Sequence, residues 1–170
     1  FLILSVITSA FCLFLVQPLL AKQVLPWFGG TASVWAACMV FYQAALLGGY
    51  VYAHALTRWL KPRGQAWTHL ALVGSSLLTL PVGLAKMGRP EAGQGHPEWQ
   101  IVWLLLVAVG GPYFVLSSTS PLMQAWYARL EPGGKAYHLF GWSNLACALA
   151  LLSFPKAGGT AAFAARQLGG

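Results

Sequence analysis

Acidic residues are almost missing from this sequence of 170 residues, which has no aspartate and only three glutamates, Glu91, Glu98 and Glu131. Catalysis by paired carboxylates therefore finds few candidates, and a Ser–His–Asp triad lacks its acid. The sequence also lacks a strand, Gly-rich turn and helix in succession, the arrangement that binds dinucleotide cofactors. We therefore expect no catalytic residue and no cofactor in this chain.

Charged residues of both signs are scarce, at 8% of the sequence, whereas 58% of the residues are hydrophobic. Soluble domains carry about 25% charged residues, so this composition suits a helical bundle in lipid better than a globule in water. The net charge of +7 is spread over loops and ends, which argues against nucleic acid as a partner. The cysteines lie in apolar runs without metal-ligand spacing, which predicts small buried hydrophobes, no metal site and no disulfide framework. These cysteines are Cys12, Cys38 and Cys147.

Long apolar segments predict an all-α fold, an integral membrane bundle of about five transmembrane helices. The helices are expected near residues 1–20, 32–59, 66–85, 99–119 and 137–154. Residues 1–155 would form this transmembrane domain, and the Gly- and Ala-rich residues 156–170 a disordered, frayed or loosely helical tail. The sequence begins at Phe1 and shows no basic signal-peptide segment. We therefore expect a fragment whose first segment is a membrane helix.

The fourth predicted helix contains two prolines, Pro112 and Pro121, with four consecutive hydroxyl residues between them. Each proline removes one backbone donor and disfavours helix in the residue before it, so we expect this helix to be broken. In lipid, the freed backbone groups need partners, and nearby hydroxyls could supply them. These are Ser117, Ser118, Thr119 and Ser120. The alternative is a kinked helix whose hydroxyls bond their own backbone.

The second predicted helix carries two informative faces. Ala45, Gly49 and Ala53 recur every four residues, a spacing that permits close approach of another helix. A neighbouring face carries three polar residues, which line up along the helix because they are seven and four positions apart. These polar residues are Gln43, Tyr50 and His54.

Polar residues in several helices lead to one hypothesis about a site. An unpaired buried polar group costs about 1–3 kcal/mol, so such groups are expected to converge on one internal cavity that could bind a substrate. The candidates are Gln17, Gln43, Tyr50, His54, Ser117, Ser118, Thr119, Ser120, Gln124 and Asn144. The alternative is a set of separate local hydrogen bonds, in which each residue serves its own helix.

The turn between the second and third helices is the most basic part of the sequence, with Arg58, Lys61 and Arg63 close together. The positive-inside rule places such a turn in the cytoplasm. The N-terminus would then also be cytoplasmic, and Pro155 would lie outside after an odd number of spans.

Six blocks of sequence, taken in combination, are distinctive. They are Leu15–Lys22, Leu25–Gly30, Ser33–Trp35, Leu47–His54, Pro112–Trp126 and Ser143–Leu145. Together they resemble the membrane-embedded N-terminal region of bacterial spermidine-synthase-like proteins, in which a major-facilitator-like membrane part is fused to a synthase domain.

This resemblance implies a multi-pass protein of the bacterial inner (plasma) membrane. Its partners would be the lipid bilayer and a C-terminal synthase-like domain with a Rossmann-like, aminopropyltransferase-like fold, whose motifs this chain lacks. We therefore expect a membrane tether or scaffold for that domain. The alternative is a major-facilitator-like half transporter or permease for a small molecule such as a polyamine. The lack of acids inside the predicted helices argues against carriage of a polycation.

Overall fold

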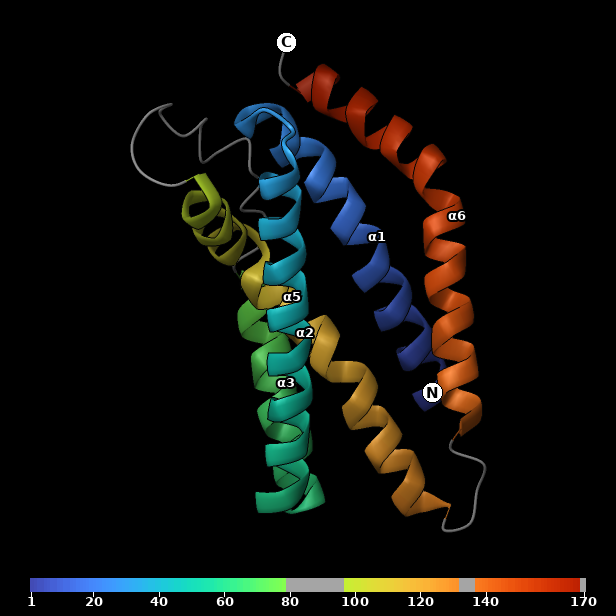
Figure 1. Ribbon diagram of the computed structural model, residues 1–170. Helices are drawn as coiled ribbons and strands as arrows, with labels where there is room; N and C mark the ends of the chain where they lie inside the picture. Colours follow the sequence, from blue (N-terminus) through green and yellow to red (C-terminus); the bar gives the residue numbers. More distant parts are fainter. Residues whose placement is uncertain (79–96, 132–136, 169–170) are drawn as a thin grey trace.

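The computed structural model describes residues 1–78, 97–131 and 137–168. Within these ranges the regular structure is entirely helical, which confirms the all-α prediction (Figure 1). The helices are α1 (Leu2–Phe28), α2 (Ala32–Trp59), α3 (Pro62–Leu78), α5 (Pro97–Leu130) and α6 (Tyr137–Leu168).

Four helices in the described ranges are long and apolar enough to cross a membrane. They are Leu2–Phe28, Ala32–Trp59, Glu98–Leu130 and Tyr137–Lys156. The described part of α3 has 17 residues and is not among them, and the predicted continuation over 79–85 lies outside the described residues. Four of the five helices predicted from the sequence are therefore long enough, within the described residues, to cross a bilayer.

Helix α2 has the predicted bounds, and the side chain of Thr31 caps it by accepting a hydrogen bond from the backbone N–H of Val34 (3.5 Å). Helix α1, in contrast, does not end near residue 20, and it continues through Pro18 and Pro26. Its extra turns bury Ala21 and Val24, and this packing outweighs the two backbone hydrogen bonds that the prolines remove. The helix ends at Gly29, whose backbone is left-handed (φ 87°), a conformation that favours glycine at this position.

Helix α5 is continuous from Pro97 to Leu130, so the predicted break at the prolines is wrong. Buried side chains on both sides of each proline hold the helix against its neighbours, for example Tyr113 and Leu122. Helix α6 likewise continues through Pro155, beyond the predicted end near residue 154. The residues that follow are rich in alanine, the strongest helix former, which favours helix in this segment.

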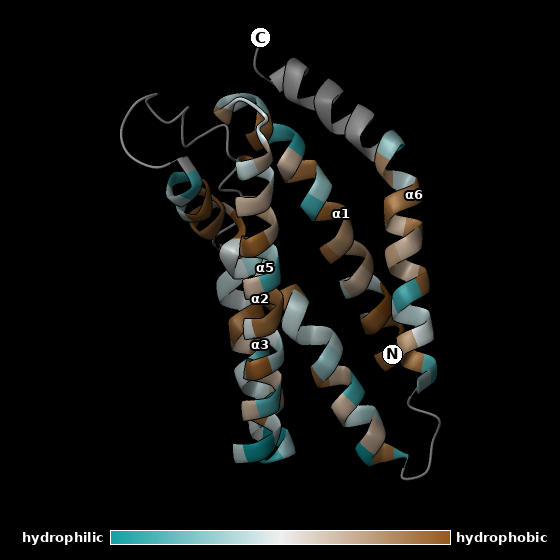
Figure 2. Ribbon diagram, in the orientation of Figure 1, coloured by the Kyte–Doolittle hydropathy of each residue, from teal (hydrophilic) through white to brown (hydrophobic). Residues whose placement is uncertain are grey.

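Helices α1, α2 and α5 pack on one another, most closely α2 on α5. Helix α6 packs on α1, and α3 lies beside α5 and α2. The N-terminus and the α2–α3 turn lie towards one end of the molecule, and the end of α6 lies at the opposite end (Figure 1). Hydrophobic residues dominate most of α1 and the middle of α6, whereas hydrophilic residues gather at the α2–α3 turn (Figure 2).

The largest hydrophobic cluster lies between α1, α2 and α5, and it includes Leu13, Phe41, Tyr42 and Leu105. Helices α2 and α5 come very close at Gly49, since a Cβ added there would lie 2.9 Å from backbone atoms of α5. This confirms that the face of Ala45, Gly49 and Ala53 permits close helix approach. Among the cysteines, Cys38 is buried as predicted, whereas the other two are half-buried.

Candidate functional site

The structure does not gather the ten candidate polar residues into one cavity. Four of them have exposed side chains, namely Gln43, Tyr50, His54 and Asn144. The expectation of a common internal cavity is therefore wrong for these four. For the three residues in α2, the reason is that small residues take the inward face of that helix, which turns the neighbouring polar face outward. Whether exposed residues of this group contact a substrate stays a prediction.

The hydroxyl residues of α5 mostly serve their own helix. Ser118 and Thr119 donate hydrogen bonds to the carbonyl of Val115 (3.0 and 2.7 Å), and Ser120 accepts one from Gln124 (3.2 Å). This is the local bonding that we kept as the alternative. Ser117 differs, because its hydroxyl lies 2.8 Å from the carbonyl of Phe114 and 3.2 Å from that of Ala45 in α2.

Gln17 is the one candidate that joins three helices. Its amide donates to the hydroxyl of Tyr113 in α5 (2.5 Å), and its backbone carbonyl accepts from the hydroxyl of Tyr42 in α2 (3.4 Å). The rings of the two tyrosines lie 5.2 Å apart, and both residues are buried. Tyr42 was not among the predicted residues, although it precedes Ala45 by three positions and so lies on the packed face of α2.

A second polar contact joins α3 to α5. The Nε2 atom of His69 lies 3.2 Å from the hydroxyl of Thr119, whose own proton goes to a carbonyl of α5. His69 must therefore donate through Nε2, which leaves Nδ1 as a bare acceptor. That Nδ1 and the nearby hydroxyl of Tyr52 are both buried without a partner among the described residues, with the two rings 6.2 Å apart.

The third polar link is a node around Gln65, which is fully buried. Its amide nitrogen donates to the carbonyl of Leu60 (2.7 Å), and its amide oxygen accepts from Trp126 (2.7 Å) and Arg129 (3.3 Å). Arg129 also donates to the carbonyl of Thr57 (2.9 Å), so the node ties α2, α3 and α5 together. The sequence reasoning missed Gln65 because the third helix was predicted to begin at residue 66, whereas α3 begins at Pro62 and places Gln65 in its first turn.

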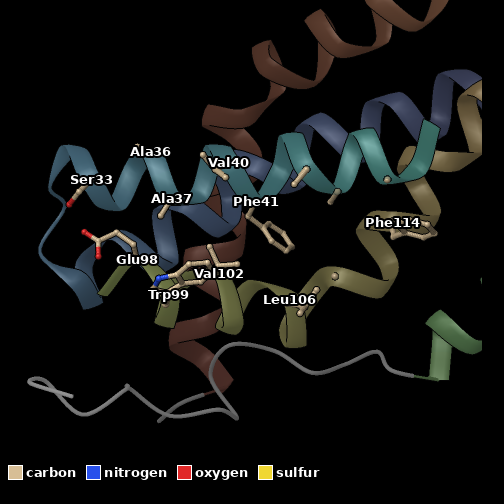
Figure 3. Close-up of a pocket in the computed structure, with 14 residues that line it drawn as sticks. Ser33, Ala36, Ala37, Val40, Phe41, Glu98, Trp99, Val102, Leu106 and Phe114 are labelled. Atoms are coloured by element: carbon tan, nitrogen blue, oxygen red, sulfur yellow. The ribbon is translucent and has the colours of Figure 1, made fainter. Parts of the chain in front are cut away.

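A separate apolar groove of about 740 Å³ lies between α2 and α5 (Figure 3). Small residues form much of its α2 wall, and Trp99, Leu106 and Phe114 contribute from α5. Ser33 and Glu98 lie together at one end of the groove, away from Phe114. Glu98 was expected in a loop, but it lies in the first turn of α5 and is half-buried, because α5 begins at Pro97.

In the described part of the chain, no group of three or more His, Cys, Asp or Glu side chains could hold a metal ion. Comparison of the sequence and structure with protein families, curated proteins and solved structures finds no match. The function therefore has to follow from the residues and their geometry.

Proposed function

We propose that this chain is a membrane anchor that holds a synthase-like domain at the inner membrane of a bacterium. The observation that carries this proposal is the use of inward polar groups as links between helices. Gln17 bonds Tyr113, Gln65 bonds Trp126 and Arg129, and His69 lies within bonding distance of Thr119.

These links suit a scaffold better than a permeation path. Polar groups inside a membrane bundle need internal partners, and pairing across helices fixes how the helices pack. A path for a polar solute needs polar side chains that stay open to the solute instead. Four helices of membrane length and many exposed apolar side chains support insertion of the scaffold into lipid.

The identity of the anchored domain rests on the resemblance of the sequence blocks to spermidine-synthase-like proteins. Aminopropyl transfer would then occur in that domain and not in this chain. If the basic α2–α3 turn lies in the cytoplasm and the chain crosses the membrane an odd number of times, residue 168 would lie on the external side. A cytoplasmic synthase domain would then require at least one more membrane helix after residue 168.

The test uses the complete reading frame that contains this chain. The full-length protein should show aminopropyltransferase activity in the membrane fraction, resistant to extraction with alkaline carbonate. Deletion of the membrane part should move that activity to the soluble fraction with kcat unchanged. A reading frame without a synthase domain, or activity that is soluble before the deletion, would contradict the proposal.

The groove between α2 and α5 favours a second candidate, a major-facilitator-like half transporter or permease for a small molecule such as a polyamine. Its half-buried Glu98 offers a carboxylate at one end of an otherwise apolar channel-like space. Proteoliposomes containing the chain should then take up labelled putrescine, and Glu98→Gln should abolish uptake. The matched control is Glu131→Gln, which removes an exposed acid at the other end of α5. Equal background uptake in all three proteins would exclude this candidate.

A further inference from the structure

A small cleft lies where the beginning of α1, the beginning of α3 and the end of α5 meet. Its volume is about 300 Å³, and its lining residues are Leu2, Pro62, Ala66, Trp126, Arg129 and Leu130. Five of these are apolar or aromatic, and Arg129 is the charged member. The cleft therefore places one positive charge beside an apolar wall, which suits an amphiphile with an anionic head.

The guanidinium of Arg129 is held in position without losing its charge. It donates to the amide oxygen of Gln65 (3.3 Å) and to the carbonyl of Thr57 (2.9 Å), and both acceptors are uncharged. An arginine has five N–H donors, so three remain for another acceptor. Because Arg129 is exposed, these donors are accessible to a phosphate, which arginine binds through paired hydrogen bonds.

The surroundings of the cleft are also positive. Arg58, Lys61 and Arg63 are exposed in and beside the α2–α3 turn. Among the described residues, the acid at this end is Glu131, whose carboxylate already accepts a hydrogen bond from Tyr127 (2.7 Å).

We propose that this cleft binds an anionic phospholipid, with its headgroup phosphate on Arg129 and an acyl chain along Trp126 and Leu130. Basic pockets between membrane helices on the cytoplasmic side bind such headgroups, and this turn is the predicted cytoplasmic end. A free phosphate would use Arg129 equally well, but it would leave the apolar walls without a role. Charge and apolar lining together therefore select a lipid.

The experiment measures lipid retention by native mass spectrometry of the purified full chain. The protein is exchanged into mixed micelles with either phosphatidylglycerol or phosphatidylcholine and then stripped with detergent. Arg129→Gln removes the charge, and Ala66→Phe fills the cleft from an exposed position and leaves the charge of Arg129 in place. Lys22→Gln is the matched control, because it removes an exposed charge from the other end of α1.

One molecule of phosphatidylglycerol should be retained in preference to phosphatidylcholine. Because a hydrogen bond to a charged group is worth about 1.5–3 kcal/mol, retention should fall about tenfold or more in Arg129→Gln. Retention should also fall in Ala66→Phe, which keeps the positive charge, and should be unchanged in Lys22→Gln. Equal retention of the two lipids, or equal loss in the control, would overturn the proposal. So would displacement of the lipid by millimolar inorganic phosphate, which would identify a phosphate site instead.

Discussion

The crossing of α2 and α5 at Gly49 should be the most sensitive packing contact in the molecule. In Gly49→Ala the new Cβ would overlap the hydroxyl of Ser117 and would lie 2.9 Å from the backbone carbon of Ser117 and the backbone nitrogen of Ser118. A side-chain hydroxyl can rotate away, but backbone atoms in the middle of a helix cannot. The two helices must therefore separate by several tenths of an ångström.

The size of the effect follows from three contributions. Overpacking costs about 1–3 kcal/mol, and rotation of Ser117 removes its hydrogen bond to Ala45 in α2, worth about 0.6 kcal/mol. Replacing glycine by alanine inside a helix returns up to about 1 kcal/mol. The variant should therefore be less stable by about 0.5–3.5 kcal/mol.

The matched controls are Gly74→Ala and Gly141→Ala, because an added Cβ meets nothing within 4 Å at either helical position. Their stability should stay the same or rise by up to about 1 kcal/mol. Unfolding in detergent micelles, followed by circular dichroism, measures all three variants. The opposite signs make the comparison independent of the detergent. A Gly49→Ala protein as stable as the controls would refute the close crossing. Full rescue by Ser117→Ala would show that only the hydroxyl, and not the backbone, limits the approach.

Three further predictions test the polar links and the topology. Tyr113→Phe removes the acceptor for Gln17 and should lower the free energy of unfolding by about 1 kcal/mol. Tyr52→Phe removes a buried hydroxyl without a described partner, so the stability of this variant should stay the same or rise. A loss of stability in Tyr52→Phe would indicate that the hydroxyl binds a water. Gln65→Leu should cost about 1–3 kcal/mol in the same unfolding assay, because it removes three part-buried hydrogen bonds from the node, and a cost under about 0.5 kcal/mol would contradict the node. In a cysteine-free background, an impermeant thiol reagent added to intact cells should label Gly30→Cys but not Gly64→Cys, and the reverse result would invert the predicted orientation.

The chemistry of the chain can be tested in a similar way. Purified protein incubated with an aminopropyl donor and putrescine should give no spermidine above background, because the chain lacks a Gly-rich donor-binding motif. The control is a bona fide aminopropyltransferase under the same conditions. Turnover that disappears on mutation of a single residue of this chain would contradict the expectation.

Composition and periodicity were sufficient for the helical class, because apolar runs of bilayer length leave few other solutions. They also gave the bounds of α2 and the small-residue face at Gly49, since both depend on spacing along one helix. The scarcity of acids likewise argued against carboxylate catalysis before any geometry was known.

Tertiary packing decided two features that local sequence rules predicted wrongly: whether a helix continues through its prolines, and which way its polar side chains point. Pro112 and Pro121 were predicted to break their helix, but side chains buried beside them hold α5 continuous, and α1 likewise continues through Pro18 and Pro26. The direction in which a polar residue points also depends on its neighbours in space. His54 lies outward because Gly49 and Ala53 take the packed face of α2, while Gln65 lies inward because Trp126 and Arg129 meet it from a helix 61 or more residues away. Sequence spacing determines which residues share a face of a helix, but only the packing of the other helices determines which face is buried.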